Sequence, residues 1–354
     1  MVDYLVVGLG LAGISFCEVL EEKGKTFKVV ADGSQQASKV AGGLYNPVIL
    51  KRFTMAWKAK QQLELAKPFY QRLEGKLGVK LDYELPVLRK FASTEEQNMW
   101  FEASDRPELD YFLSTKILPN NNPKIDAPHG FGKVKYTGRI DTGTLVRSYK
   151  SYLEKKGQFL NESLDFDALF ISDEDITYKK ITAKNIVFAC GYGLKQNPYF
   201  AYLPLNGTKG ELLIIHAPEY KEKNVIKSSV FTIPMENDKY LVGATYKWKD
   251  KTNTPTEESK GELLEKLKTF LKCDFKIVGH VAGIRPTVVD RRPLVGGHPE
   301  HQNMYVLNGF GSRGVLIGPY ASKQLFDYIE NKTDLDPEMD IQRFTKKYYA
   351  ISLL

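Results

Sequence analysis

The feature that most constrains this chain is a glycine-rich turn between a short apolar strand and a helix. Residues 2–7 have the pattern of a buried parallel strand, and residues 12–23 have a helical pattern. In the turn between them, Gly8 permits the tight bend and Gly10 lets the backbone approach a pyrophosphate, while Gly13 allows helix and strand to pack closely. The sequence therefore predicts a nucleotide-binding βαβ unit.

An acidic residue after the next strand strengthens this prediction. Residues 27–31 read as a second strand, and Asp32 follows it, 19 residues after Gly13. An acid at this spacing binds the hydroxyls of an unphosphorylated ribose, which favours FAD or NAD over NADP. The alternative is a glycine-rich turn without a ligand, and the complete strand–turn–helix–strand context argues against it.

Three further segments have patterns that suit a flavin or its substrate. Adjacent glycines within residues 38–47 suggest backbone that lies against a flat ligand. Arg285 precedes Pro286, which stiffens the segment for bidentate carboxylate recognition. Residues 308–316 form a second glycine turn before a helix, whose N-terminus can stabilise negative charge on a reduced flavin. Taken singly, these segments also fit an ordinary loop, a structural salt bridge and a helix cap.

The rest of the chain predicts a second, largely antiparallel layer. Residues 209–216, 228–234 and 239–245 read as strands, and residues 257–272 as an amphipathic helix. We expect an α/β protein with a Rossmann-type FAD-binding domain and an α+β substrate domain built on an antiparallel sheet. The FAD-binding domain would comprise residues 1–78, 140–195 and 290–354, and the substrate-binding domain residues 79–139 and 196–289. Two more helices are expected at residues 54–77 and 141–157, and strand material at residues 81–92.

Composition narrows the setting in which such a protein works. No stretch reaches 18 apolar residues, so no membrane insertion is expected. The few, widely separated cysteines predict no disulfide framework and favour a cytoplasmic location; they are Cys17, Cys190 and Cys273. The histidines are scattered, so no metal site is predicted. These patterns predict no particular oligomeric state.

The formal net charge is +7, and some lysines are grouped, as at Lys247, Lys249 and Lys251. A solvated basic surface is the favoured interpretation, because many soluble proteins carry such a charge without a polyanionic partner. An acidic or nucleic-acid partner is the alternative.

Taken in order, these motifs resemble the D-amino acid oxidase/glycine oxidase superfamily of FAD enzymes over nearly the whole chain. The resemblance also covers the strand at residues 186–191 and the segments 203–204, 209–211, 241–245 and 309–319. It implies non-covalent FAD and hydride transfer to flavin N5 from the α-carbon of a small-molecule amine or amino acid. In this superfamily the step depends on positioning and an unprotonated amine rather than on a side-chain base.

The resemblance also assigns residues to each part of the site. Arg285 would bind the substrate carboxylate. The residues implied for FAD are Gly8, Gly10, Leu11, Ala12 and Gly13 at the pyrophosphate, Asp32 at the ribose, Ala41, Gly42, Gly43 and Leu44 by the isoalloxazine, Leu164 at the adenine end, Ala189 and Gly191 beside the nucleotide, and Gly311, Ser312, Arg313, Gly314, Val315 and Leu316 over the flavin. Ser38 is a further residue expected to bind FAD.

A narrower resemblance involves RNA. Segments 43–47, 243–246 and 311–314 are similar to the oxidase domain of the bifunctional enzyme that modifies the wobble uridine of tRNA. That domain removes a carboxymethyl group from an aminomethyl uridine, so its target is an N-substituted glycine. This sequence contains no methyltransferase domain and has Lys209 where an arginine is common. A free-standing amine or amino-acid oxidase is therefore the first expectation and a tRNA substrate the second; an NAD-linked dehydrogenase or a non-catalytic nucleotide-binding module is the third.

Overall fold

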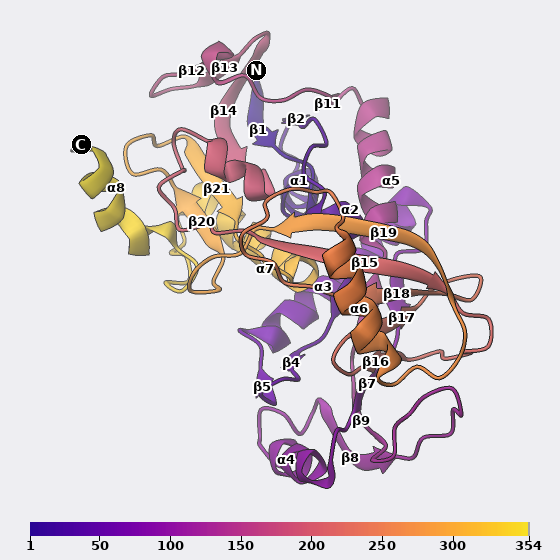
Figure 1. Ribbon diagram of the computed structural model, residues 1–354. Coiled ribbons are helices and arrows are strands. Elements are labelled where there is room, and N and C mark those ends of the chain that lie inside the picture. The colour runs from indigo at the N-terminus through magenta and orange to yellow at the C-terminus, as the bar shows by residue number, and fades with distance from the viewer. Residues whose placement is uncertain (353–354) are drawn as a thin grey trace.

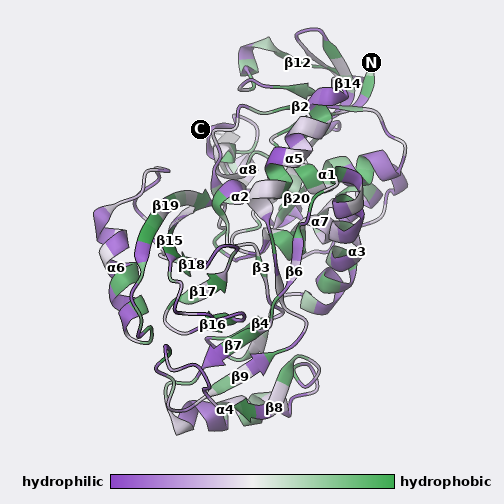
Figure 2. Cartoon of the chain, turned by 90° about the vertical axis from the view of Figure 1, so that its right-hand side faces the viewer, coloured by the Kyte–Doolittle hydropathy of each residue, from purple (hydrophilic) through white to green (hydrophobic). Residues whose placement is uncertain are grey.

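The computed structural model describes residues 1–352, which form two eight-stranded sheets with helices packed against them. In Figure 1 the N-terminal strands lie at the top, and the second sheet extends across the right-hand and lower parts of the molecule. In Figure 2, α3 (Ala59–Leu77) and α6 (Glu257–Lys268) alternate between hydrophobic and hydrophilic residues, as helices with one buried face do. The predicted mixed α/β class is confirmed.

The first sheet has a parallel centre. Its strand order is β11 (Phe159–Leu160), β2 (Phe27–Val30), β1 (Val2–Val7), β14 (Ile181–Phe188), β13 (Ile176–Tyr178) and β12 (Leu169–Ile171). β21 (Met304–Asn308) pairs with the second half of β14, and β20 (Leu294–Gly297) pairs with β21. Because β11, β2, β1, β14 and β21 are parallel, their carboxyl ends lie along one edge of the sheet.

Helices cover one face of this sheet. The largest apolar core cluster joins β1 to α1 (Leu11–Glu22), α3, α5 (Thr142–Lys155) and α7 (Gly314–Asn331). α1 and α7 pack closely at Gly318, which has no side chain. A Cβ there would lie only 2.6 Å from Ser15 Oγ. The other face of the sheet is covered by the segment around η2 (Gly191–Gln196) and by Phe200 and Leu203. The remaining short helices are η1 (Phe166–Ala168), η3 (Ile341–Phe344) and α8 (Thr345–Ser352).

The second sheet is antiparallel except where β16 meets β7. Its order is β19 (Lys276–Arg285), β15 (Thr208–His216), β18 (Lys239–Gly243), β17 (Phe231–Pro234), β16 (Val225–Lys227), β7 (Val87–Lys90), β9 (Phe131–Val134) and β8 (Leu113–Leu118). α6 buries Leu263 and Leu267 against it, in a core cluster shared with β15 and β18.

Short elements connect the two sheets. α2 (Ala37–Val40) contacts β19, and a three-stranded sheet has the order β3 (Leu44–Tyr45), β10 (Gly138–Ile140) and β6 (Asp82–Glu84). A two-stranded sheet pairs β4 (Val48–Ile49) with β5 (Thr54–Met55). The two large sheets draw on different stretches of the chain, and the domain boundaries given above remain a prediction. Among the described residues, no helix has both the length and the apolar character needed to span a bilayer.

Several predicted elements have different bounds, for identifiable reasons. The helix expected over residues 54–77 begins at Ala59, because Lys58 has a left-handed φ of 46° and residues 54–55 form β5. The strand material at residues 81–92 is divided into β6 and β7 near Pro86, which has no amide N–H. The helix expected over residues 257–272 ends at Lys268, since Leu271 pairs with Ile125.

The sequence prediction lacks α2 (Ala37–Val40), α8 (Thr345–Ser352) and α4 (Thr94–Ser104), of which α4 is the longest. α4 (Thr94–Ser104) begins after Ser93, whose Oγ accepts a hydrogen bond from the Glu96 amide at 3.3 Å. A serine followed three residues later by glutamate is a helix-start pattern that can be recognised in the sequence. α4 lies beside β8 in the lower part of Figure 1, far from the parallel strand ends.

Candidate active site

A cavity of ≈ 570 Å³ lies at the carboxyl ends of the parallel strands. Val7, Val30 and Phe188, which line it, are at or next to the ends of β1, β2 and β14. The cavity extends to the second sheet, where Gly210 and Gly283 line it. Open α/β sheets bind nucleotides at this edge, and the volume is in the range of small-molecule and cofactor sites.

Most of the predicted site residues meet in this cavity, although they come from distant parts of the chain. Those that line it are Gly8, Gly10, Leu11, Ala12, Asp32, Ser38, Ala41, Gly42, Gly43, Leu44, Leu164, Ala189, Gly191, Arg285, Gly311, Ser312, Gly314 and Val315. Gly13, Arg313 and Leu316 do not line it. Gly13 packs under the turn, where a Cβ would lie 2.0 Å from the Gly8 carbonyl oxygen, and Leu316 is buried in α7.

The turn between β1 and α1 has the geometry that a pyrophosphate requires. Gly8 has a φ of 104°, which side chains disfavour, and a Cβ on Gly10 would lie 2.9 Å from Ser38 Oγ. The Leu11 amide donates to Ser38 Oγ at 3.1 Å. The first hydrogen bond of α1 runs from the Ile14 amide to the Gly10 carbonyl, so the amides of Ala12 and Gly13 precede it; together with the positive helix end they suit a phosphate pair.

Asp32, the residue predicted to bind a ribose, lines the cavity and is held by two hydrogen bonds. Its Oδ1 accepts a hydrogen bond from the Ser34 amide at 2.8 Å, and its Oδ2 accepts one from the Ser163 hydroxyl. Partial burial acts to raise the pKa of this carboxyl, but the hydrogen bonds from Ser163 and Ser34 outweigh it and hold the pKa below its usual value. Asp32 is therefore ionised at neutral pH. Ser163 is absent from the predicted site residues, although its neighbour Leu164 is among them.

Bare backbone forms the end of the cavity where the sequence predicts the isoalloxazine ring. Gly43 has a φ of 68°, and a Cβ there would lie 1.9 Å from the Ile140 carbonyl oxygen. A Cβ on Gly42 would lie 3.1 Å from Ile233 Cδ1, so this segment packs directly on β17. On the opposite side, α7 begins without a side-chain cap, next to the cavity-lining Gly314. Backbone without side chains leaves room for the flat ring system of FAD, and the N-terminus of α7 suits its negative charge when reduced.

Arg285, the residue predicted to bind the substrate carboxylate, lines the cavity where it meets the second sheet, across Gly210 of the neighbouring strand. A Cβ on Gly210 would lie 1.9 Å from Arg285 Nη2, so only glycine leaves room for the guanidinium. Arg285 Cζ lies 4.4 Å from the centroid of the Tyr246 ring, and Nη1 donates to the Thr245 carbonyl at 3.2 Å. Within the part of the chain that the structure describes, no carboxylate pairs with Arg285. Burial lowers its pKa, but the group stays charged at neutral pH.

Arg313 is a second half-buried cation near Tyr246. Its Nη2 donates to the Asn46 carbonyl at 2.6 Å, which ties the start of α7 to the segment before β4. Burial lowers the pKa of Arg313 to about 10, so it is also protonated at neutral pH. This contact joins the segment at Asn46 to Arg313, which precedes the cavity-lining Gly314.

Gly210 and Tyr246 line the cavity beside Arg285 and are absent from the predicted site residues. The signal for Gly210 is present in the sequence, because an isolated glycine in a strand often marks a close approach of another group. Tyr246 has no such signal, since it follows the end of β18 and reaches Arg285 only through the fold.

Comparison with known proteins gives matches over most of the chain. The family model described as "DAO: FAD dependent oxidoreductase" matches residues 3–328. Glycine oxidase from Bacillus licheniformis is 31% identical over 352 residues, which is 92% of each chain. Glycine oxidase from Bacillus subtilis (strain 168) is 24% identical over 355 residues, which is 93% of each. Similarity of this extent includes both large sheets and the cavity between them.

Solved structures and a tRNA-related protein also match. Glycine oxidase from Geobacillus kaustophilus superposes with a TM-score of 0.77 at 18% identity over 97% of both chains. Iminodiacetate oxidase from Chelativorans sp. BNC1 superposes with a TM-score of 0.77 at 17% identity over 97% of this chain and 98% of that one. The tRNA 5-methylaminomethyl-2-thiouridine biosynthesis bifunctional protein MnmC of Azoarcus sp. (strain BH72) is 26% identical over 185 residues, or 45% of this chain and 29% of that protein.

Proposed function

Because the chain belongs to the DAO family of FAD dependent oxidoreductases, we propose that it oxidises the C–N bond of an amino acid or secondary amine that carries a carboxylate. Membership of the family confirms the resemblance seen in the sequence. It also makes the protein an FAD-dependent enzyme, and the glycine-lined cavity suits that cofactor. The substrate class is the part that we propose.

The observation that carries the proposal is the Arg285 guanidinium. It is charged and half-buried, it borders the cavity, and no carboxylate in the described residues neutralises it. A guanidinium in such a setting stabilises a planar carboxylate through two parallel hydrogen bonds. The names of two relatives support this chemistry, because glycine and iminodiacetate are both amines that carry a carboxylate on the carbon next to nitrogen.

The side chains around Arg285 position a substrate rather than take up its proton. No histidine lines the cavity within residues 1–352, and its carboxylates, Asp32 and Glu162, belong to the ribose end. Bound FAD supplies an acceptor for the hydride that leaves the carbon next to nitrogen. We therefore propose that Arg285 holds the carboxylate, that Tyr246 covers the guanidinium, and that the amine reacts in its unprotonated form.

Anaerobic reduction of the purified holoenzyme tests the proposal. Glycine, sarcosine, iminodiacetate, D-amino acids and L-proline would each be mixed with the enzyme while the oxidised flavin absorbance is followed. We expect at least one of these compounds to bleach the flavin, at a rate that increases with pH as the amine loses its proton. If none of them bleaches the flavin at any pH at which FAD stays bound, the proposed substrate class is wrong.

A modified uridine of tRNA is a second candidate substrate, and exposed aromatic residues favour it. Tyr246, which lines the cavity, is 58% exposed, and Trp248, two residues further on, is 52% exposed. Lys249 is exposed too, and no ion pair of its ammonium appears in the described part of the chain. Aromatic rings with adjacent cations are a common platform for nucleobases. The partial match to the tRNA biosynthesis protein points in the same direction.

Two measurements separate this candidate from the first. tRNA that carries carboxymethylaminomethyl uridine should bleach the flavin anaerobically, and binding should weaken steeply as salt increases. Trp248→Ala should reduce turnover of tRNA and leave turnover of a small amine unchanged. If this tRNA neither binds nor bleaches the flavin, the second candidate is eliminated and the first stands.

A further inference from the structure

Residues 244–256 connect β18 to α6 and include both contacts of Arg285. Thr245 offers its carbonyl to Arg285 Nη1, and the Tyr246 ring faces the guanidinium. This connecting segment has no regular secondary structure of its own, apart from a bridge between Lys247 and Lys209 of β15. The position of this segment therefore depends on the side chains of β15 that bind it. The position of Arg285 depends on them in turn.

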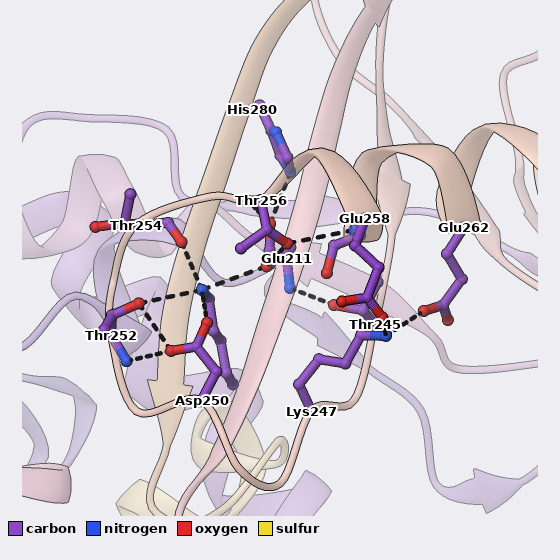
Figure 3. A network of polar contacts seen from close by, with 12 residues as sticks. Glu211, Thr245, Lys247, Asp250, Thr252, Thr254, Thr256, Glu258, Glu262 and His280 are labelled. Carbon is purple, nitrogen blue, oxygen red and sulfur yellow. Dashed lines mark hydrogen bonds and ion pairs between the residues drawn. The ribbon is translucent and has the colours of Figure 1, made fainter.

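Lys209 is the centre of those groups. Its side chain is 0% exposed, and its ammonium lies 2.5 Å from Asp250 Oδ2 and 2.5 Å from the Thr254 carbonyl oxygen. A third bond reaches Thr252 Oγ1 at 3.3 Å. Figure 3 shows Asp250, Thr252 and Thr254 grouped on one side of this network. One buried ammonium thus joins three residues of the connecting segment to β15.

Glu211 extends the network to the end of the segment. Its side chain is also 0% exposed and lies 3.4 Å from the Lys209 ammonium. Its two carboxylate oxygens accept hydrogen bonds from the Thr256 amide at 2.8 Å and the Thr256 hydroxyl at 3.0 Å, just before α6. His280 Nε2 lies 2.9 Å from the same carboxylate, on the side of β19. Figure 3 shows Thr256 and His280 on the Glu211 side of the network.

On β15, Lys209 and Glu211 of the network are the immediate neighbours of Gly210, which faces Arg285. Lys209 and Lys247 exchange backbone hydrogen bonds of 2.9 and 3.0 Å, and the Glu211 amide donates to Thr245 Oγ1 at 3.0 Å. Between them, Gly210 faces the Arg285 guanidinium. Displacement of the segment at Asp250 would therefore be transmitted to Thr245 and to the ring of Tyr246.

We propose that Lys209 is a positioning residue for the substrate carboxylate site, because it holds residues 244–256 in the place where Thr245 and Tyr246 fix the Arg285 guanidinium. The proposal rests on the proposed role of Arg285 in binding a carboxylate. A buried ammonium among carboxylates adds little stability compared with apolar residues of the same size, so stability alone does not account for it.

The test compares three variants for their ability to bind a carboxylate. Asp250→Ala removes the main partner of Lys209 at a side chain that is 34% exposed, so the protein should fold. Lys209→Met removes the ammonium itself. Lys266→Met is the matched control, because its ammonium pairs with Glu262 on α6 and lies outside residues 244–256. Acetate is titrated into each holoenzyme, and the change in the flavin spectrum gives the dissociation constant.

We expect Asp250→Ala to weaken acetate binding roughly threefold to tenfold and Lys209→Met at least roughly tenfold, with the FAD content of Asp250→Ala unchanged. Lys266→Met should bind acetate as the wild type does. Trypsin should also cut after Lys249 faster in Asp250→Ala than in the control, because the segment is released. In an Arg285→Ala background, Asp250→Ala should have no further effect on the acetate titration.

Two results overturn the proposal in different ways. If the wild type responds to acetate and Asp250→Ala responds equally, with the same trypsin cleavage, Lys209 does not position the site and the role of Arg285 is unaffected. If the wild-type flavin does not respond to acetate at all, the proposed role of Arg285 fails and the positioning role of Lys209 fails with it.

Discussion

Gly210→Ala is the substitution for which the structure gives the most specific expectation. The added Cβ would lie 1.9 Å from Arg285 Nη2 and 2.1 Å from Cζ. Gly210 lies in the middle of a strand, outside the left-handed region, so alanine suits its backbone. The atoms that must move belong to the end of a flexible side chain, so we expect the guanidinium to be displaced and the protein to fold.

The size of the displacement sets the size of the effect. Ordinary contact of a Cβ begins at 3.4 Å, so the guanidinium must move by about 1.5 Å or more from its present 1.9 Å. A bidentate hydrogen bond does not survive such a shift, and losing a buried charge-assisted pair amounts to about 2–5 kcal/mol. The dissociation constant of a carboxylate should therefore increase at least roughly 30-fold. The Tm should change little, since alanine in a strand is as stable as glycine or more stable.

Acetate titration and thermal unfolding of the same holoenzyme preparation measure both expectations. Gly261→Ala on α6 is the control, because a Cβ there meets nothing within 4 Å. The control should bind acetate and FAD as the wild type does. If Gly210→Ala keeps wild-type acetate affinity, the carboxylate does not bind at the guanidinium that lies across Gly210, and the assignment of the substrate end is wrong.

Three further predictions use other parts of the structure. Gly10→Val should abolish FAD binding, because a Cβ at Gly10 would lie 2.9 Å from Ser38 Oγ and a larger side chain fills the pyrophosphate position. Unchanged flavin content on acid release would refute this prediction. Arg285→Ala should lower kcat/KM for a carboxylate-bearing amine roughly tenfold to a thousandfold with normal flavin content, and Arg285→Lys should recover part of the loss; wild-type kinetics in Arg285→Ala would make the residue structural. Burial lowers the pKa of His298 to about 4, so below pH 6.5 the unfolded chain binds a proton that the folded protein does not, and stability falls as the pH decreases toward 4. His298→Asn should remove about 1–2 kcal/mol of this loss between pH 6.5 and 5 in urea unfolding, and an identical pH slope in both proteins would contradict it.

The nucleotide end of the site was accessible from the sequence because its residues are close together in the chain. Gly8, Gly10 and Gly13 act within one turn, and Asp32 follows the next strand, so strand and helix periodicity were enough to bring them together. The family resemblance added the more distant segments. The predicted site residues line the cavity, except for Gly13, Arg313 and Leu316.

The substrate end was only partly accessible from the sequence. Arg285 could be selected from its proline neighbour, but Tyr246 meets it through the pairing of β15 with β18 and β19, which no local pattern specifies. Lys209 and Glu211 alternate with Gly210 along β15, and that alternation alone does not reveal that their partners come from residues 250–256. The partners of Arg285 and Lys209 are therefore set by long-range strand pairing and by an irregular connecting segment, which local sequence patterns do not predict.

The central claim is that the carboxylate held by Arg285 selects the amine that is oxidised. Anaerobic stopped-flow reduction tests it with matched pairs: glycine against methylamine, and sarcosine against dimethylamine. We predict that the member with the carboxylate bleaches the flavin at least roughly tenfold faster in one or more pairs, and that Arg285→Ala removes the difference. Equal rates within every pair in the wild type, or a preference that persists in Arg285→Ala, would contradict the claim.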